Sequence, residues 1–164
     1  MRKRPLDRKL PLLSGLTENF NRKNTTKWYG LTGSNVSVTN YNVTRRQLQI
    51  ACTTSYSSVG SNETFNFIGS SVVYRVTAYP TPAPDWNGGT QTAVRVKVSS
   101  GNSVAFVSEG ANGSLTLKCR KTVGSTDSDT TVSGFNAGLM PYLRIREASG
   151  VVYWDTSPDG VTWT

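Results

Sequence analysis

Apolar residues recur at every second position in several short stretches of the chain. The clearest examples are Leu48, Ile50 and Cys52, then Val94, Val96 and Val98, and finally Leu115, Leu117 and Cys119. Strict alternation is typical of strands that bury one face, and no stretch has helical spacing. We therefore predict an all-β chain of about nine or ten short strands, arranged as a two-sheet antiparallel β-sandwich of the jelly-roll type.

The positions of the predicted strands follow from this alternation and from the turn residues between them. Strands are expected within 36–38, 45–53, 64–79 (two strands or one bulged strand), 94–98, 104–106, 115–119, 142–146 and 151–154. The proline-rich segment 80–89 and the polar segment 124–134 are predicted to be loops, the second of them mobile, because neither contains an alternating apolar pattern.

Positive charge is concentrated at the start of the chain. Residues 1–27 carry eight Lys or Arg against two acidic residues, a local net charge of +6 within the total of +8. We expect residues 1–17 to form an extended basic arm and residues 18–164 to form the sandwich. A basic arm fits an acidic partner, although a solubilising tail is the alternative. The charged residues proposed for assembly are Arg2, Lys3, Arg4, Arg8 and Lys9.

The sequence offers few groups for metal binding or catalysis. It contains two cysteines and no histidine, so a zinc site is disfavoured and the Ser-His-Asp and Cys-His arrangements are absent. We expect Cys52 and Cys119 to be free thiols in the core, with a disulfide across the sandwich as the alternative. No catalytic residue, metal or cofactor is predicted.

Carboxylate pairs are the remaining source of catalytic chemistry. Glycosidases place two carboxylates roughly 5 to 10 Å apart on one rigid surface. Asp127 and Asp129 have a suitable spacing but fall in a predicted loop, and Asp155 and Asp159 are interpreted as turn formers. We therefore predict a protein that binds or assembles and is not an enzyme.

Two surface features are candidates for binding. The loop sequence Asp85-Trp86-Asn87 combines an indole with polar groups, which suits a sugar, although Trp86 capping the core is the alternative.

Basic residues also occupy the outward positions of three predicted strands, where they could form one basic sheet face. These residues are Arg95, Lys97, Lys118, Arg120, Arg144 and Arg146. Aromatic residues are not interleaved with them, which disfavours nucleic acid and favours solvent or an acidic subunit.

The end of the chain contains a compact turn sequence. Its defining residues are Ser157, Asp159, Gly160, Thr162 and Trp163. They resemble an Asp-box, although Asp159 and Gly160 are adjacent where that motif has a spacer. An Asp that accepts backbone N–H groups, a Gly with positive φ and a packing Trp predict a structural turn with no catalytic role.

Several segments together resemble the concanavalin A-like lectin/glucanase jelly roll found in minor tail and other virion structural proteins of bacteriophages. The similar segments are Asn19-Phe20-Asn21-Arg22 with Trp28, Ser70–Val76, Pro141–Arg146, Val152–Trp154 and Ser157–Trp163. The resemblance covers residues 18–164. Members of this class place a further strand after the segment that matches Trp163, so the domain is expected to lack a closing strand here.

The resemblance implies a non-enzymatic virion structural protein of a tailed bacteriophage. Its expected partners are other virion proteins, through acidic surfaces of neighbouring subunits, in an oligomeric assembly. The alternative is a carbohydrate-binding module of a larger protein, such as an adhesin for host-surface glycans. The sequence contains no apolar run of membrane length and no signal peptide, so we expect synthesis in the host cytoplasm and location in the virion.

Overall fold

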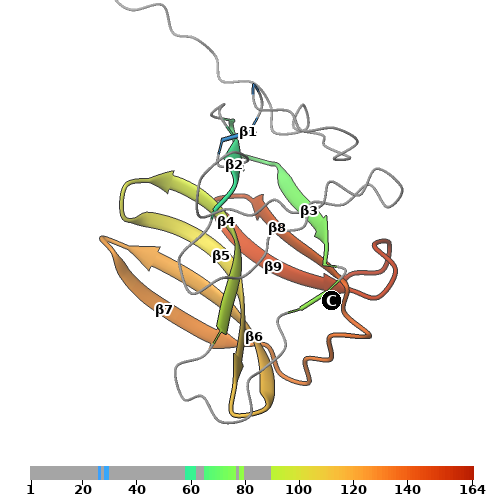
Figure 1. Cartoon of the computed structure of the whole chain (residues 1–164). Coiled ribbons are helices and arrows are strands. Elements are labelled where there is room, and N and C mark those ends of the chain that lie inside the picture. Colours follow the sequence, from blue (N-terminus) through green and yellow to red (C-terminus); the bar gives the residue numbers. More distant parts are fainter. Residues whose placement is uncertain (1–25, 27, 30–57, 62–64, 77, 80–89) are drawn as a thin grey trace, which may run out of the picture. The chain divides into compact units, whose positions relative to one another are not determined.

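The computed structural model describes residues 26, 28–29, 58–61, 65–76, 78–79 and 90–164 (Figure 1). The chain divides into two compact units, Met1–Phe67 and Ile68–Thr164. In the first unit, β1 (Trp28–Tyr29) pairs antiparallel with β2 (Gly60–Ser61). The predicted strands 36–38 and 45–53, Cys52 and the boundary at residue 17 lie outside the described residues. Within the described residues there is no helix that could span a membrane.

The second unit contains two antiparallel sheets, which appear in Figure 1 as a yellow-to-orange sheet and a green-and-red sheet. The three-stranded sheet has the order β3-β8-β9, with β3 at Ser71–Arg75, β8 at Tyr142–Ala148 and β9 at Val151–Ser157. The four-stranded sheet has the order β4-β5-β6-β7, with β4 at Thr90–Ser99, β5 at Asn102–Ala111, β6 at Ser114–Val123 and β7 at Thr126–Thr131. The prediction of an all-β chain with two antiparallel sheets is confirmed for the described residues.

Tight turns connect neighbouring strands. Three hairpins close through two consecutive residues of positive φ, namely Asn112–Gly113, Gly124–Ser125 and Ser149–Gly150. Turns of this hand match the right-handed twist of the strands on either side, and Gly and Asn reach positive φ at the lowest cost. The sequence predicted the turns at Asn112–Gly113 and Ser149–Gly150, whereas it predicted Gly124–Ser125 to begin a long loop and not a hairpin.

The polar segment 124–134 is the largest error in the predicted strands. Residues Thr126–Thr131 form β7, an exposed edge strand, and not a mobile loop. All six residues are polar, so no apolar alternation marks the strand. Among the described strands its backbone pairs only with β6, and Asp127 and Asp129 project toward the β6 residues Thr122 and Arg120.

Two other predictions require correction. The alternation of Phe65 and Phe67 does not make a strand, because only a single bridge at Asn66 precedes the turn at Ile68 and Gly69. Val98 was expected to face inward, but a register shift between Lys97 and Ser99 leaves its side chain exposed. A bulge of this kind inserts a residue and ends the alternation locally.

The core lies between the two sheets. Phe106 and Leu117 are buried on the four-stranded sheet, and Leu143 and Ile145 are buried on β8. The Tyr74 ring meets the Phe106 ring edge-on at 6.4 Å between centroids. The Trp154 indole Nε1 donates a hydrogen bond of 2.9 Å to the Ala105 carbonyl, which connects β9 to β5. Contacts between the inner faces therefore position the two sheets.

Cys119 lies on the same sheet face as Phe106, its direct partner across β5 and β6. Its thiol is free, and burial raises the pKa of Cys119 to about 11. A thiol in this environment is mostly protonated at neutral pH and reacts slowly. The expectation of a free, inward-facing thiol is therefore met at Cys119.

Candidate functional site

The outer face of the three-stranded sheet brings arginine and aromatic side chains together. The strand register places Val73, Arg144 and Asp155 in one row, and Ser71, Arg146 and Tyr153 in the next. Side chains directly opposite one another project from the same face of an antiparallel sheet. We call this surface the arginine–aromatic face; it consists of Val73, Arg75, Tyr142, Arg144, Arg146, Val151, Tyr153, Asp155 and Trp163.

Asp155 organises the centre of this face. Its Oδ2 accepts a hydrogen bond of 2.8 Å from Nε of Arg144 and another of 2.8 Å from Nε of Arg146. Its side chain is 12% exposed, so the carboxylate is largely removed from water. Asp155 was interpreted from the sequence as a turn former, which is wrong, because it lies on β9 and holds two guanidinium groups. A charge-assisted pair of this kind fixes both arginine side chains.

Each arginine of this face also lies over an aromatic ring. The Cζ atom of Arg146 is 4.0 Å from the Tyr153 ring centroid, and that of Arg144 is 4.2 Å from the Trp163 centroid. The Cζ atom of Arg75 is 5.6 Å from the Tyr142 centroid. These distances are within the range in which the ring quadrupole attracts a guanidinium cation. Stacking and the shared carboxylate therefore hold the charged groups in defined positions.

The turn after β9 carries Trp163 to this face. The Asp159 Oδ1 accepts backbone hydrogen bonds of 2.8 Å from Val161 and from Thr162, and the Ser157 hydroxyl donates to the same oxygen at 2.9 Å. Gly160 has φ of 78°, and a Cβ there would approach the Tyr142 ring to 3.1 Å. The structure thus places the predicted turn residues, Ser157 to Trp163, in one turn that packs against the outer face.

The electrostatics of this turn depend on the Asp159 carboxylate. Hydrogen bonds from the Thr162 and Val161 amides, together with the Ser157 hydroxyl, lower the pKa of Asp159 to about 2. Beyond the turn, the backbone of Thr164 exchanges two hydrogen bonds with that of Thr156, at 2.8 and 3.0 Å. The turn is therefore anchored at both ends, which positions the Trp163 indole between them.

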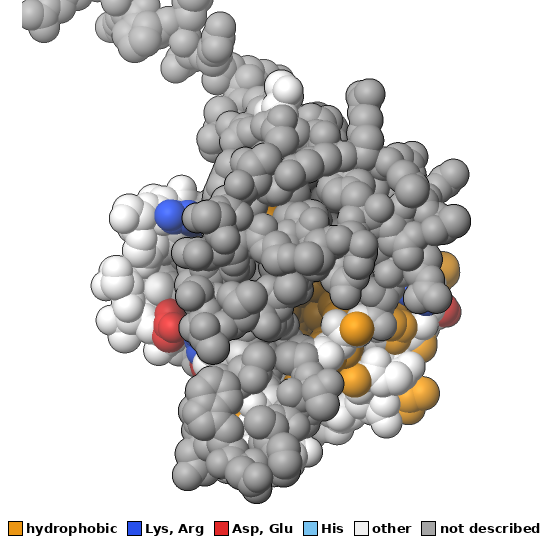
Figure 2. Space-filling model, in the orientation of Figure 1, with side chains coloured by type: hydrophobic (Ala, Val, Ile, Leu, Met, Phe, Trp, Pro, Cys, Tyr) orange, Lys and Arg blue, Asp and Glu red, His pale blue; other side chains and the backbone are white. Residues whose placement is uncertain are grey.

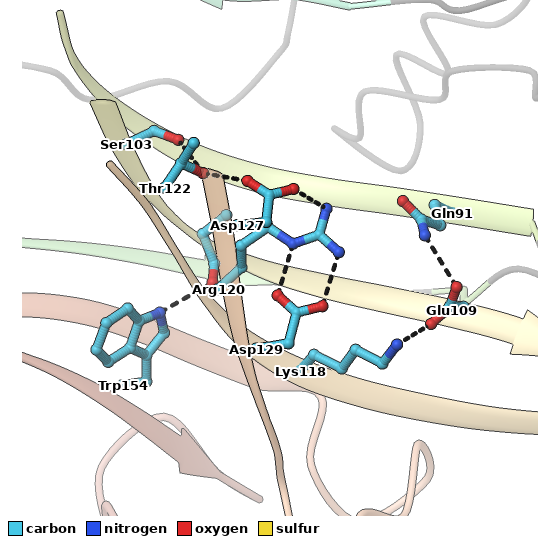
Figure 3. Close-up of polar contacts among 10 residues, drawn as sticks. Gln91, Ser103, Glu109, Lys118, Arg120, Thr122, Asp127, Asp129 and Trp154 are labelled. Carbon is cyan, nitrogen blue, oxygen red and sulfur yellow. Dashed lines mark hydrogen bonds and ion pairs between the residues drawn. The ribbon is translucent and has the colours of Figure 1, made fainter. Parts of the chain in front are cut away.

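The outer face of the four-stranded sheet has a separate polar network (Figure 3). The Arg120 guanidinium donates to both oxygens of Asp129, at 2.7 and 2.8 Å, and lies 3.1 Å from Asp127. Glu109 forms an ion pair with Lys118 and accepts a hydrogen bond of 2.9 Å from Gln91. The Lys118 hydrogen bond lowers the pKa of Glu109, and the Arg120 hydrogen bond lowers the pKa of Asp129.

Asp127 and Asp129 are two residues apart on one strand, so their side chains project from the same face, as a catalytic carboxylate pair could. The prediction that they lie in a loop is wrong, since both are on β7. Both, however, are bound to Arg120, and the pKa of Asp129 is lowered, whereas a general acid needs a raised pKa. The pair therefore supports the edge strand and is unsuited to acid catalysis.

The predicted single basic sheet face is not observed. Arg95, Lys97, Lys118 and Arg120 are on the four-stranded sheet, whereas Arg144 and Arg146 are on the three-stranded sheet. Lys118, Arg120, Arg144 and Arg146 are moreover all paired with carboxylates. On the face shown in Figure 2, the described residues present small separate groups of blue and red and no continuous blue surface. This arrangement gives no support to a polyanion-binding sheet.

The other predicted site residues lie outside the described residues. These are the loop residues Asp85, Trp86 and Asn87 and the arm residues Arg2, Lys3, Arg4, Arg8 and Lys9. Within the part of the chain that the structure describes, no three His, Cys, Asp or Glu side chains are grouped as a metal site would require.

The arginine–aromatic stacking was not predicted from the sequence, and the interpretation that aromatic residues are not interleaved with the outward cations is wrong for Arg144 and Arg146. The only indication of the stacking in the sequence is that Tyr142, Arg144 and Arg146 occupy every second position of one strand. Tyr153 and Asp155 do the same on the next strand. The strand register was needed to show that these two rows lie opposite each other.

Comparison of the chain with known protein families, curated proteins and solved structures found no match. Evidence on the function therefore comes from the chain's own residues, from their geometry and from the resemblance of its motifs to the concanavalin A-like jelly roll.

Proposed function

We propose that this protein is a non-enzymatic virion structural protein of a tailed bacteriophage, either a minor tail protein or one that decorates the particle. In this proposal the basic N-terminal arm binds acidic surfaces of neighbouring subunits, and the sandwich is displayed on the particle. The resemblance to phage virion domains of the concanavalin A-like class supports it. The segments of that resemblance with described structure lie mainly in β3, β8, β9 and the turn after β9.

The proposal that the protein is not an enzyme is supported by the pairing of its carboxylates within the protein. Every acidic side chain in the described part of the chain accepts hydrogen bonds or ion pairs from the protein itself. These side chains are Glu109, Asp127, Asp129, Glu147, Asp155 and Asp159. Carboxylates committed to structure are poor general bases and nucleophiles, and the sequence has no histidine to replace them. Binding and assembly are the functions that this chemistry supports.

Deletion of residues 2–17 tests the role of the arm. We expect the shortened protein to keep its β-type circular dichroism spectrum but to be lost from purified particles. A second variant, with Arg2, Lys3, Arg4, Arg8 and Lys9 all changed to Gln, separates charge from length. Both variants should fail to join particles if the arm binds acidic surfaces. Normal incorporation of the deletion variant, measured by mass spectrometry of purified particles, would exclude the anchoring role.

Carbohydrate binding is the second candidate, and the sequence Asp85-Trp86-Asn87 is what favours it. An indole next to amide and carboxylate groups can stack on a sugar and hydrogen-bond to its hydroxyls. A glycan array with the intact protein, and with Trp86→Ala as the control, tests this function. Sugar binding that the substitution abolishes would favour the module; no binding across the array would favour the structural role.

A further inference from the structure

We propose that the arginine–aromatic face is a docking surface for an acidic, partly apolar segment of a neighbouring protein subunit. The inference deepens the proposed function and rests on it in one respect, since it takes the domain to work inside a protein assembly. It names a surface on the sandwich, separate from the basic arm, and the chemistry of the partner that this surface fits.

The described residues of the arginine–aromatic face carry more positive than negative charge. Among the described residues, the face carries the three guanidinium groups of Arg75, Arg144 and Arg146 against the single carboxylate of Asp155, which leaves a net charge of +2. Arg144 and Arg146 donate to Asp155 through Nε only, and within the described residues their Nη groups have no hydrogen-bond acceptor. Arg75 likewise has no carboxylate partner in the described part of the chain. These donors, which have no acceptor in the described part of the chain, match the carboxylates of Asp or Glu on a partner.

The arginine–aromatic face also exposes apolar side chains. Val73 is 51% exposed, Val151 is 50% exposed and Tyr153 is 39% exposed, all on the same side of the sheet as the arginines. Protein interfaces are enriched in Tyr, Trp and Arg and bury aliphatic side chains next to them. A partner segment that places aliphatic groups between its carboxylates would cover both kinds of surface.

Two arginines of the arginine–aromatic face are preorganised by contacts within the protein. Arg146 and Arg144 are held by Asp155 and by the rings of Tyr153 and Trp163, so their side chains are ordered before any partner arrives. Immobilising a long side chain on binding costs conformational entropy, and most of that cost is avoided where the side chain is already held. The same stacking disfavours a sugar or a nucleobase, because one face of each ring is already covered by a guanidinium group.

Site-directed photo-crosslinking in cells that produce the particle tests the proposal with the full chain. Benzoylphenylalanine is introduced at Val73 in one variant and at Val151 in another, which are exposed positions on separate strands. The control carries it at Val98, an exposed valine on β4. We expect cross-links from Val73 and Val151, well above the Val98 control, to a peptide of another protein with Asp or Glu next to the attachment point.

A matched pair of charge variants makes the test specific. Arg75→Gln on the arginine–aromatic face is compared with Arg95→Gln, which removes the same charge from an exposed position on β4. We expect Arg75→Gln to reduce the cross-link yield about tenfold, equivalent to about 1.4 kcal/mol, and Arg95→Gln to leave it unchanged. Equal effects of the two substitutions would overturn the proposal, because the face would then contribute only general charge.

The outcomes also separate this inference from the function on which it rests. An acidic peptide from a protein outside any virion would contradict the virion assignment and keep the docking surface. A virion protein cross-linked through a neutral or basic segment would keep the assignment and overturn the docking surface. Cross-links to glycan or nucleic acid, or yields no higher than at Val98, would also overturn it.

Discussion

The indole of Trp163 lies over the guanidinium of Arg144, with 4.2 Å between the ring centroid and Cζ. Trp163 belongs to the turn after β9, and Arg144 belongs to β8, so the turn reaches back over the outer face of the sheet. The same guanidinium donates to Asp155 on β9. Arg144, on the central strand β8 of the three-stranded sheet, thus contacts both the edge strand β9 and the turn after it.

Trp163→Ala is expected to lower the free energy of unfolding by about 1–2 kcal/mol, the range of a partly desolvated cation–π contact. Urea denaturation of the full protein measures the change. Val161→Ala is the control, because that residue is in the same turn but is highly exposed, and we expect it to change stability by less than about 0.5 kcal/mol. Similar losses in both variants would mean that the turn, and not the ring contact, is responsible.

Asp155→Asn is expected to destabilise the protein by about 2 kcal/mol, below the 3–5 kcal/mol of a fully buried pair because both arginines are partly exposed. The substitution keeps the shape of the side chain but leaves two guanidinium groups without a carboxylate. Asp129→Asn is the matched control on the other sheet, where Asp127 still faces Arg120, and should cost about 1 kcal/mol or less. A larger loss at Asp129 would contradict the central role of Asp155.

The turn after β9, which Asp159 stabilises, is expected to loosen only in strong acid. The pKa of Asp159 in the folded protein is about 2, below the unfolded value of about 3.9. Its stabilising contribution is therefore fully present above pH 4 or so and is lost as the pH falls through about 2. Carboxyl NMR titration measures this midpoint directly, and amide exchange at Val161 and Thr162 should accelerate over the same range. A midpoint near 4 would show that the two amides do not bind the carboxylate in solution.

Tyr74→Phe is expected to leave stability unchanged or to raise it by about 1 kcal/mol, because the Tyr74 hydroxyl is buried and has no hydrogen-bond partner among the described residues. Burial also holds the pKa of Tyr74 well above its usual value. Tyr79→Phe is the opposite case, since the Tyr79 hydroxyl donates to the Met140 carbonyl at 3.0 Å, and it should cost about 1 kcal/mol. Thermal denaturation compares the two variants. Clear destabilisation by Tyr74→Phe would indicate a partner for its hydroxyl.

The alternation of apolar and polar residues was sufficient to predict which side chains point inward where one face of a strand is buried. The alternation in 142–146 correctly placed Leu143 and Ile145 inside and Arg144 and Arg146 outside, because successive side chains of a strand point to opposite faces. The same reasoning failed for β7, whose residues are all polar. That strand exists because its backbone completes the β6 ladder and its two aspartates bind Arg120.

The sequence by itself determined the all-β class, the turns at Asn112–Gly113 and Ser149–Gly150 and the phase of most apolar strands, since each of these depends on neighbouring residues and on the pleat of the backbone. Tertiary structure decided which strands share a sheet. It therefore separated the six predicted outward cations into two groups and brought Trp163 and Asp155 to Arg144. The physical reason is that strand order follows from burying a common core through long-range pairing, which alternation within a single strand does not specify.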